Sequence, residues 1–188
     1  MTDLMVLIGR FRPFHKSHES LIKEALLKAP YVLVLVGSSF QPANTKNPWS
    51  YLEVAEMIHT KFDPQKVIVF PLTDKDSDIE WSANVKEIVG LASRFLEPYF
   101  GREPIVSLTG HKKDESSYYL DLFPEWEFIP MKNTTGFNAT AIREQFFKDG
   151  SFPKGYLSKE IEQYLIDWKN EYPYLYEELS NEFKKSNS

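Results

Sequence analysis

The chain has 188 residues, a formal net charge of −5 and no cysteine, and 42% of its residues are hydrophobic. These values fit one domain with a full apolar core, and they exclude thiol catalysis, thiolate metal sites and a disulfide framework. The acidic balance argues against a nucleic-acid binder that works through a broad basic field. No apolar run approaches the roughly 20 residues that span a bilayer, and the first residues lack the basic start of a signal peptide. We therefore expect a cytoplasmic protein that binds neither membranes nor nucleic acid.

The first third of the chain alternates between two hydrophobic patterns. Residues 4–9 and 31–36 are continuous apolar runs closed by glycine, which is typical of strands buried on both faces. Between them, apolar residues recur at helical spacing over 21–29. A second helix is expected over 50–62 and a third strand over 67–70.

The rest of the chain continues this alternation. The next long helix has an apolar stripe formed by Val85, Ile88, Val89, Ala92 and Phe95. Strands are expected over 104–109 and 126–131, and a helix over 138–148. Two further helical stripes, which begin at Ile161 and Leu175, form a tail.

Short connections between alternating strands and helices predict an α/β fold. We expect a doubly wound parallel sheet of about five strands, with helices on both faces and a helical C-terminal tail. The main domain is predicted over 1–157, and 158–188 form an appendix packed on the same domain or on a neighbouring subunit. Ligands of such sheets bind beyond the carboxyl ends of the strands. That rule singles out the loops 10–18, 38–49, 72–81 and 110–114.

The first of these loops carries the most informative segment, Gly9-Arg10-Phe11-Arg12-Pro13-Phe14-His15-Lys16-Ser17-His18. The free N–H groups at the start of the following helix, together with its dipole, make an anion site. His15 and His18 lie on one side of the first helical turn, Arg10 and Arg12 add two guanidinium groups, and Ser17 is a candidate helix cap. This set suits phosphoryl or nucleotidyl transfer, in which catalysis is mainly positioning and neutralisation of charge. The alternative, two surface histidines at a helix start, does not account for the flanking arginines.

The same segment resembles the Gly-Arg-Phe-Gln-Pro-Phe-His-x-Gly-His signature of archaeal-type nicotinamide-mononucleotide adenylyltransferases. The signature also occurs in the adenylyltransferase domain of bacterial fusions with a Nudix hydrolase, and it marks the HxGH nucleotidyltransferase superfamily. The resemblance covers residues 4–157 and implies a Rossmann-like sheet, with ATP and nicotinamide mononucleotide as substrates. It assigns to ATP binding both histidines and the residues Gly9, Arg10, Phe11 and Arg12.

Two further stretches resemble loops of the same family that bind the mononucleotide. Residues 44–49, followed by Glu53, resemble a loop that runs from a basic residue through Asn-Pro-aromatic to Glu-Arg. By this resemblance, Lys46 contacts the substrate phosphates, while Asn47 and Trp49 bind the mononucleotide. Pro71, Asp74 and Trp81 resemble a Pro–Asp–Trp pattern whose tryptophan stacks on the nicotinamide ring, and an indole face suits a flat cation. The alternative for Trp81 is a core position in the following helix.

The last two stretches concern ATP. Residues 137–143 resemble the family's Ile-Ser-x-Thr-x-x-Arg motif at the start of a late helix. Asn138 or Thr140 is expected to cap that helix, and its N–H groups with Arg143 would hold the β- and γ-phosphates. Gly110 and His111 follow the fourth strand as in the Nudix-fused branch, where the glycine lets adenosine approach the backbone and the histidine contacts the nucleotide.

Three departures from the family pattern matter for the site. Ser17 replaces the glycine between the histidines and adds a side chain where ATP is expected. Val54 replaces the arginine of the Glu-Arg pair and removes one fixed charge. Asn138 replaces a serine and keeps the ability to cap a helix.

The resemblance implies an in-line transfer in which the mononucleotide 5′-phosphate attacks the α-phosphorus of ATP. The catalytic residues would be His15, His18, Lys46 and Arg143. No carboxylates have a clear metal-binding spacing, so Mg²⁺ is expected to arrive on the triphosphate. Two alternatives stay open: an adenylyl- or cytidylyltransferase for nicotinate mononucleotide, flavin mononucleotide or phosphopantetheine, and a non-catalytic nucleotide-binding pseudoenzyme. The aromatic-rich tail also leaves a homo-oligomer open.

Overall fold

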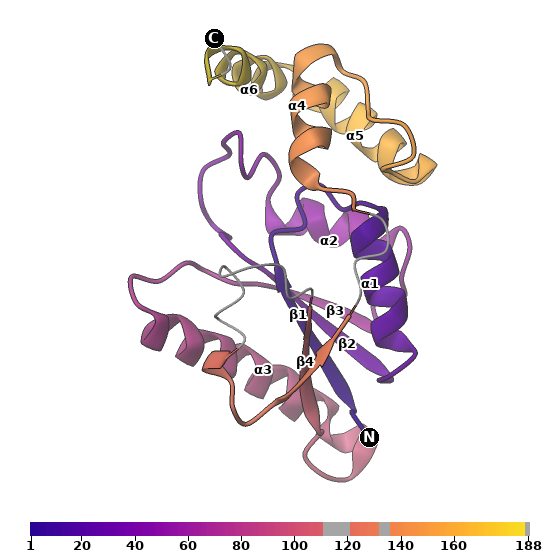
Figure 1. Ribbon diagram of the computed structural model, residues 1–188, viewed down its shortest axis with the longest axis vertical. Helices are drawn as coiled ribbons and strands as arrows, with labels where there is room; N and C mark the ends of the chain where they lie inside the picture. The colour runs from indigo at the N-terminus through magenta and orange to yellow at the C-terminus, as the bar shows by residue number, and fades with distance from the viewer. Residues whose placement is uncertain (111–120, 132–135, 187–188) are drawn as a thin grey trace. The chain divides into compact units, whose positions relative to one another are not determined.

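The expected strands and helices are present in the computed structural model, which describes residues 1–110, 121–131 and 136–186. Figure 1 shows the elements, which follow in the order β1 (Leu4–Gly9), α1 (Lys16–Leu26), β2 (Tyr31–Val36), α2 (Tyr51–His59), β3 (Val67–Pro71), α3 (Asp78–Phe100), β4 (Val106–Gly110), β5 (Glu127–Pro130), α4 (Ala139–Asp149), α5 (Lys159–Glu171) and α6 (Pro173–Ser186). Within these described ranges we find no helix with the length and apolarity that crossing a bilayer requires.

The strands form one parallel sheet in the order β3-β2-β1-β4-β5. The chain winds outward from β1 to β3 and then crosses back to β4, so the strand order reverses between β1 and β4. Right-handed crossovers place α1 and α3 on opposite faces of such a sheet, as Figure 1 shows. The predicted doubly wound, Rossmann-like α/β fold of five strands is therefore confirmed. Ligands of these folds bind at the carboxyl edge, beside the point of reversal.

The two central strands are buried on both faces, as their continuous apolar runs predicted. Residues 4–7 and 32–36 are each at most 1% exposed. On one face they pack against α3, whose buried stripe consists of Val85, Val89, Ala92 and Leu96. Burial of each valine or leucine contributes about 1.5–3 kcal/mol. The expectation that Phe95 belongs to this stripe is wrong, because its side chain is 66% exposed and its ring lies beside Tyr99 on the solvent side of the helix.

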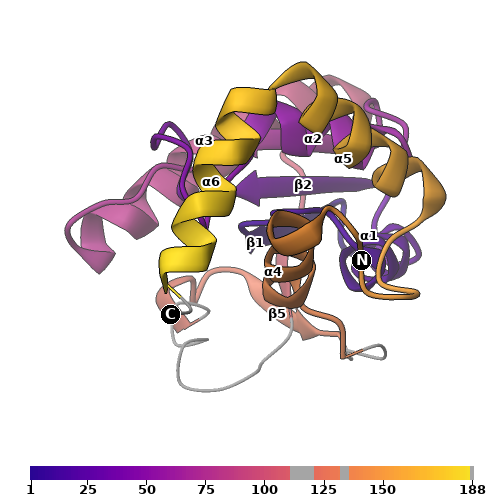
Figure 2. The ribbon, with the colours of Figure 1, turned by 90° about the horizontal axis from the view of Figure 1, so that it is seen from above.

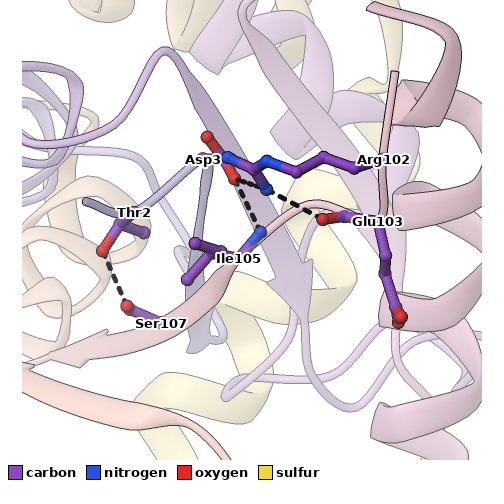
Figure 3. Close-up of polar contacts among 6 residues, drawn as sticks. All are labelled: Thr2, Asp3, Arg102, Glu103, Ile105 and Ser107. Carbon is purple, nitrogen blue, oxygen red and sulfur yellow. Dashed lines mark hydrogen bonds and ion pairs between the residues drawn. The ribbon is translucent and has the colours of Figure 1, made fainter. Parts of the chain in front are cut away.

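Polar contacts join β1 to β4 at the amino-terminal edge of the sheet (Figure 3). The Thr2 and Ser107 hydroxyls are 2.8 Å apart. The Asp3 carboxylate accepts a hydrogen bond from Arg102 Nη1 and another from the Ile105 amide, each 2.7 Å long. Burial alone would raise the pKa of Asp3, but these two bonds outweigh it and hold the pKa below its usual value.

The chain divides into two compact units. The first contains residues 1–10, 20–40 and 62–133, with the sheet and α3; the second contains 11–19, 41–61 and 134–188, with α2, α4, α5 and α6. Helix α1 begins in the second unit and ends in the first. The predicted boundary between 157 and 158 stays a prediction.

In the second unit, hydrogen bonds join α5 to α2, and α6 packs beside α4, as Figures 1 and 2 show. From α5, Trp168 Nε1 donates to Glu53 and the Tyr164 hydroxyl donates to Glu56, each at 2.5 Å. Burial and the Glu56 carboxylate raise the pKa of Tyr164. From α6, the Tyr176 hydroxyl donates to the Phe146 carbonyl at 2.6 Å.

Candidate active site

The paired histidines stand at the start of α1, and their rings stack. The ring centroids of His15 and His18 are 3.7 Å apart, with an interplanar angle of 23°. The Phe11 and Phe14 rings lie 4.7 and 5.9 Å from the His18 ring. His15 is 4% exposed. The stack therefore presents two imidazoles as one packed unit at the first turn of a helix.

A hydrogen bond orients the His15 ring. Its Nδ1 accepts the Ser17 backbone N–H at 3.2 Å. The neutral ring that accepts at Nδ1 carries its proton on Nε2. His15 thereby caps α1, and its Nε2–H can donate to an anion. The expected capping by Ser17 is wrong, because α1 already begins at Lys16, and the Ser17 hydroxyl donates to the Phe137 carbonyl at 3.4 Å.

This contact from Ser17 joins the starts of two helices. Phe137 immediately precedes Asn138, whose side chain accepts the Ala141 N–H at 2.9 Å and caps α4, as the sequence indicated. The N-terminal ends of α1 and α4 therefore meet. At the start of α1 the Lys16 N–H donates to the Tyr156 carbonyl and the Ser17 N–H donates to His15. The positive ends of the two helix dipoles nevertheless make this a favourable place for phosphate oxygens.

Two buried arginines hold the loop that carries Lys46. Arg12, 2% exposed, donates from Nε to the Trp49 carbonyl at 2.6 Å. Arg143, 8% exposed, donates from Nε to the Thr45 carbonyl at 3.1 Å and from Nη1 to the Arg12 carbonyl at 2.7 Å. The loop is thus fixed at both ends by guanidinium groups, and the acceptors in these bonds are neutral carbonyl oxygens.

Lys46 lies at the tip of a tight turn between these two fixed points. The Asn44 side chain accepts the backbone N–H groups of Lys46 and Asn47, both at 2.9 Å. Asn47 is half-buried, and its side chain is 3.5 Å from Arg12 Nη1. The Lys46 side chain is exposed. These bonds therefore fix the backbone at Lys46, and its charged side chain extends into solvent.

Trp49 is placed differently from the other predicted site residues. Its side chain is 1% exposed and packs among the rings of Phe146, Phe147 and Trp168. Direct contact with a substrate would require the indole to leave this cluster. Its carbonyl, not its ring, is the part that Arg12 contacts.

The remaining predicted residues lie at the carboxyl edge of the sheet in the first unit. Asp74, after β3, is exposed and accepts the Ser38 hydroxyl at 3.3 Å. Trp81 stands in the first turn of α3, which Ser77 caps; it is half-buried, and its ring lies 6.0 Å from the Phe123 ring. Trp81 therefore packs against the core and remains partly exposed.

The ends of β1 and β4 supply the other predicted ATP contacts. Gly9 accepts the Gly37 N–H at 2.8 Å, and the Arg10 side chain that follows is exposed. Phe11 is buried and has a left-handed backbone with φ 53°. Gly110 is buried at the end of β4, and nothing described lies within 4 Å of the position where a Cβ would lie. His111 lies outside the described residues.

Sequence reasoning missed two features. Ser38 and Phe40 after β2 have left-handed backbones, with φ 51° and 64°, although neither is the glycine or asparagine that signals this conformation. Sequence reasoning also assigned no partner to Glu53: its carboxylate accepts the Ser50 amide and the Trp168 indole, while Val54, which replaces the arginine of the Glu-Arg pair, is fully buried. Among the described residues, no group of three His, Asp or Glu side chains is arranged to hold a metal ion.

Comparisons with known proteins agree with this geometry. The cytidylyltransferase-like family model matches residues 6–145. The nicotinamide/nicotinic acid mononucleotide adenylyltransferase of Acinetobacter baylyi is 35% identical over 81% of this chain and 82% of its own length. Nicotinamide-nucleotide adenylyltransferase 1 of Sulfolobus acidocaldarius is 25% identical over 87% of this chain and 89% of its own.

A solved structure is also similar. The bifunctional NMN adenylyltransferase/ADP-ribose pyrophosphatase of Francisella tularensis has a TM-score of 0.84 and 31% identity. The match covers 98% of this chain and 54% of that one, so the chain spans about half the length of the bifunctional protein. With the paired histidines, the reversed strand order and the matched family model, the chain belongs to the cytidylyltransferase-like family and, within it, to the nicotinamide-nucleotide adenylyltransferases.

Proposed function

We propose that the protein transfers the adenylyl group of ATP to nicotinamide mononucleotide and releases NAD and pyrophosphate. One observation carries the proposal: the starts of α1 and α4 meet at the stacked histidines, through the bond from Ser17 to Phe137. Two helix N-termini and a ring N–H form a set of donors suited to a polyphosphate. Membership of the nicotinamide-nucleotide adenylyltransferases indicates that the group transferred is an adenylyl group.

The transfer is a single displacement. A 5′-phosphate oxygen of the mononucleotide forms a bond to the α-phosphorus of ATP, and the bond from that phosphorus to the oxygen bridging to the β-phosphate breaks. The leaving pyrophosphate takes the electron pair. His15 would donate from Nε2 to a phosphate oxygen, and His18 would do so beside it. Since charge moves onto the leaving group, fixed donors there lower the barrier.

We propose different roles for the two cationic side chains, Lys46 and Arg143. Lys46, on its rigid turn, would follow the phosphates with a flexible side chain. Arg143 would act on the β- and γ-phosphates from its place in the first turns of α4, with Asn138 and Thr140 at the same helix end. Thr140 Oγ1 already accepts Arg143 Nη2 at 3.3 Å, which helps to orient the guanidinium.

The other substrate contacts follow the resemblance with one change. Gly9, Arg10, Phe11, Arg12, Gly110 and His111 are proposed for ATP, and Asn47, Asp74 and Trp81 for the mononucleotide. For Trp49 we propose a structural role in place of substrate contact, because its indole is buried among aromatic rings. Trp81, which is partly exposed, suits stacking on the pyridinium ring.

We propose that Mg²⁺ enters with ATP as part of the substrate. The oxygen-rich triphosphate is a ligand that Mg²⁺ prefers, and the ion usually keeps several waters. A structure of the Francisella protein in complex with AMP and a manganese ion supports the use of a divalent cation.

We further propose that residues 1–157 form the catalytic domain, and that 158–188 are an appendix packed in cis. The bonds from Trp168 and Tyr164 to α2 support cis packing. A cytoplasmic location and homo-oligomer formation through the aromatic tail are additional proposals, which fractionation and light scattering test.

The proposal is tested by assaying the purified chain with ATP and each candidate mononucleotide. We expect nicotinamide mononucleotide to give the highest kcat/KM. Comparable or higher turnover on nicotinate mononucleotide, flavin mononucleotide or phosphopantetheine would reassign the substrate, and no transfer with any of them would favour a pseudoenzyme.

His18→Ala should lower kcat about 100- to 1000-fold, by analogy with the loss of an oxyanion donor. The control is His59→Ala, at the end of α2, which should retain activity.

A further inference from the structure

One peptide group just before α2 is held on both sides by charged side chains. Its C=O belongs to Trp49 and accepts the Arg12 guanidinium at 2.6 Å. Its N–H belongs to Ser50 and donates to the Glu53 carboxylate, also at 2.6 Å. A peptide group is planar, and its C=O and N–H point in opposite directions. The cation therefore lies on the carbonyl side and the anion on the N–H side, as the dipole of the peptide group favours.

The Glu53 carboxylate is in turn held by the tail of the chain. Its Oε1 accepts the Trp168 indole N–H at 2.5 Å, while its Oε2 accepts the Ser50 N–H. Trp168 is 3% exposed, and its ring packs edge-on to the Trp49 ring, with the centroids 5.7 Å apart. Helix α5 therefore contacts both the Trp49 ring and the carboxylate that fixes the peptide group after it.

The donor to Glu53 comes from far along the chain. The family pattern has an arginine directly after this glutamate, but here that position is Val54, which is fully buried. Trp168, 115 positions away, supplies an N–H to the carboxylate. Hydrogen bonds in a chain polarise and strengthen one another. Fixing the Glu53 carboxylate therefore also fixes the peptide group that it holds.

We infer that Trp168 is a positioning residue for the loop 44–49, which carries Lys46. The inference rests on the proposed function, because that function has Lys46 act on the substrate phosphates. The loop ends at the peptide group that Glu53 holds, so the Trp168 N–H contributes to fixing that end. Displacement of a catalytic group by about 1 Å costs up to about 100-fold in rate. Trp168 thus affects the transfer from a buried position, through the backbone of the loop.

The test compares Trp168→Phe with Tyr164→Phe. Trp168→Phe keeps an aromatic ring but removes the N–H, and it should lower kcat about three- to thirty-fold with a smaller change in the KM for ATP. Tyr164→Phe is the matched control, because it removes the bond of 2.5 Å from the same helix to Glu56, which does not hold the loop. It should lower the melting temperature and leave kcat unchanged. Assays well below the melting temperature of every variant keep loss of folded protein out of kcat.

Glu53→Gln breaks the same link from the other side and keeps the size of the side chain. The amide has one acceptor oxygen in place of two, so it does not hold the Ser50 and Trp168 N–H groups as the carboxylate does. We expect kcat to fall as in Trp168→Phe, and the two changes together to cost little more than either alone. Additive losses would show that Trp168 does not act through Glu53.

Hydrogen exchange separates this inference from the proposed function. Trp168→Phe and Glu53→Gln should speed exchange of the amides over 44–50, and Tyr164→Phe should not. Unchanged exchange over 44–50, or an equal fall of kcat in Tyr164→Phe, would overturn the inference. If exchange rises as expected but the unmutated protein transfers no adenylyl group, the proposed function fails while Trp168 still positions the loop.

Discussion

Arg12 offers the sharpest test of how the second unit supports catalysis, and Arg12→Gln is the change to make. The guanidinium donates from Nε to the Trp49 carbonyl at 2.6 Å and is 2% exposed. Loss of a buried hydrogen bond from a charged donor costs about 1.5–3 kcal/mol. For a chain of this size that corresponds to a fall of about 3–10 °C in melting temperature. Glutamine is also the residue that the family signature has at this position, so the change is sterically mild.

The effect on activity follows from the loop that Arg12 holds. Without the bond to Trp49, the turn that carries Lys46 loses one of the contacts that fix it, while the bond from Arg143 to Thr45 remains. A catalytic group displaced by about 1 Å costs up to 100-fold in rate. We therefore expect Arg12→Gln to lower kcat by about 10- to 100-fold, with a smaller change in the KM for ATP. Arg12→Lys should recover part of the stability and less of kcat, since an ammonium lacks the planar fork.

A double-mutant cycle with Lys46→Ala decides whether Arg12 acts through Lys46. If it does, Arg12→Gln should cost little further activity once Lys46 is absent, so the two effects will not add. Arg102→Gln is the matched control: it removes another arginine contact, to Asp3 at 2.7 Å, and should lower stability without lowering kcat. Additive losses in the cycle, or a rise confined to the KM for ATP, would refute a positioning role of Arg12 beyond its proposed contact with ATP.

Three further changes test other parts of the structure. Ser17→Gly should change kcat/KM less than about three-fold and the free energy of unfolding by under about 1 kcal/mol. The side chain is 5% exposed, and the bond that is lost, to the Phe137 carbonyl, is long at 3.4 Å. A large gain in activity would mean that the Ser17 side chain obstructs ATP. Val54→Arg should lower the free energy of unfolding by more than about 3 kcal/mol, because the site is fully buried, and urea titration measures this loss. Asp3→Asn should cost about 1–2 kcal/mol at pH 7. Since the folded pKa of Asp3 is lowered, that stabilisation is present above the unfolded pKa of about 3.9 and is lost as pH falls through the folded pKa. The gap between Asp3→Asn and the unmutated protein should therefore narrow in urea titrations as the pH is lowered below about 3.9, and a constant gap would contradict this reasoning.

The fold followed from the sequence because its signals are local. The runs 4–9 and 31–36 are apolar at every position, which only a strand buried on both faces requires, and both are central strands. Local patterns also predicted the cap at Asn138 and the stripe that contains Val85 and Val89, and the structure has both. Phe95 was misplaced because it borders the buried stripe of α3, and periodicity alone does not decide on which side of the boundary a residue falls.

The candidate site was only partly predictable, because its decisive contacts join distant residues. The bond from Arg143 to the Arg12 carbonyl spans 131 positions, and no local pattern specifies which carbonyl a guanidinium will reach. Ser17 illustrates the same limit: a serine at a helix start is a sound candidate for a cap, but His15 takes that role and frees the hydroxyl for Phe137. Trp49 was assigned by resemblance to a substrate loop, and its burial depends on α4 and α5.

Arg12 and Arg143 bear on how the protein responds to a polyanion. Both side chains are buried, and both donate to backbone carbonyl oxygens, Arg12 to that of Trp49 and Arg143 to those of Thr45 and Arg12. A guanidinium group stays charged when it is buried, so the cost of its burial should fall when a polyphosphate binds beside it. ATP should therefore raise the melting temperature beyond what adenosine achieves at equal saturation, and Arg143→Gln should remove most of that difference. Equal stabilisation by the two ligands would show that the buried charge does not act on the phosphates.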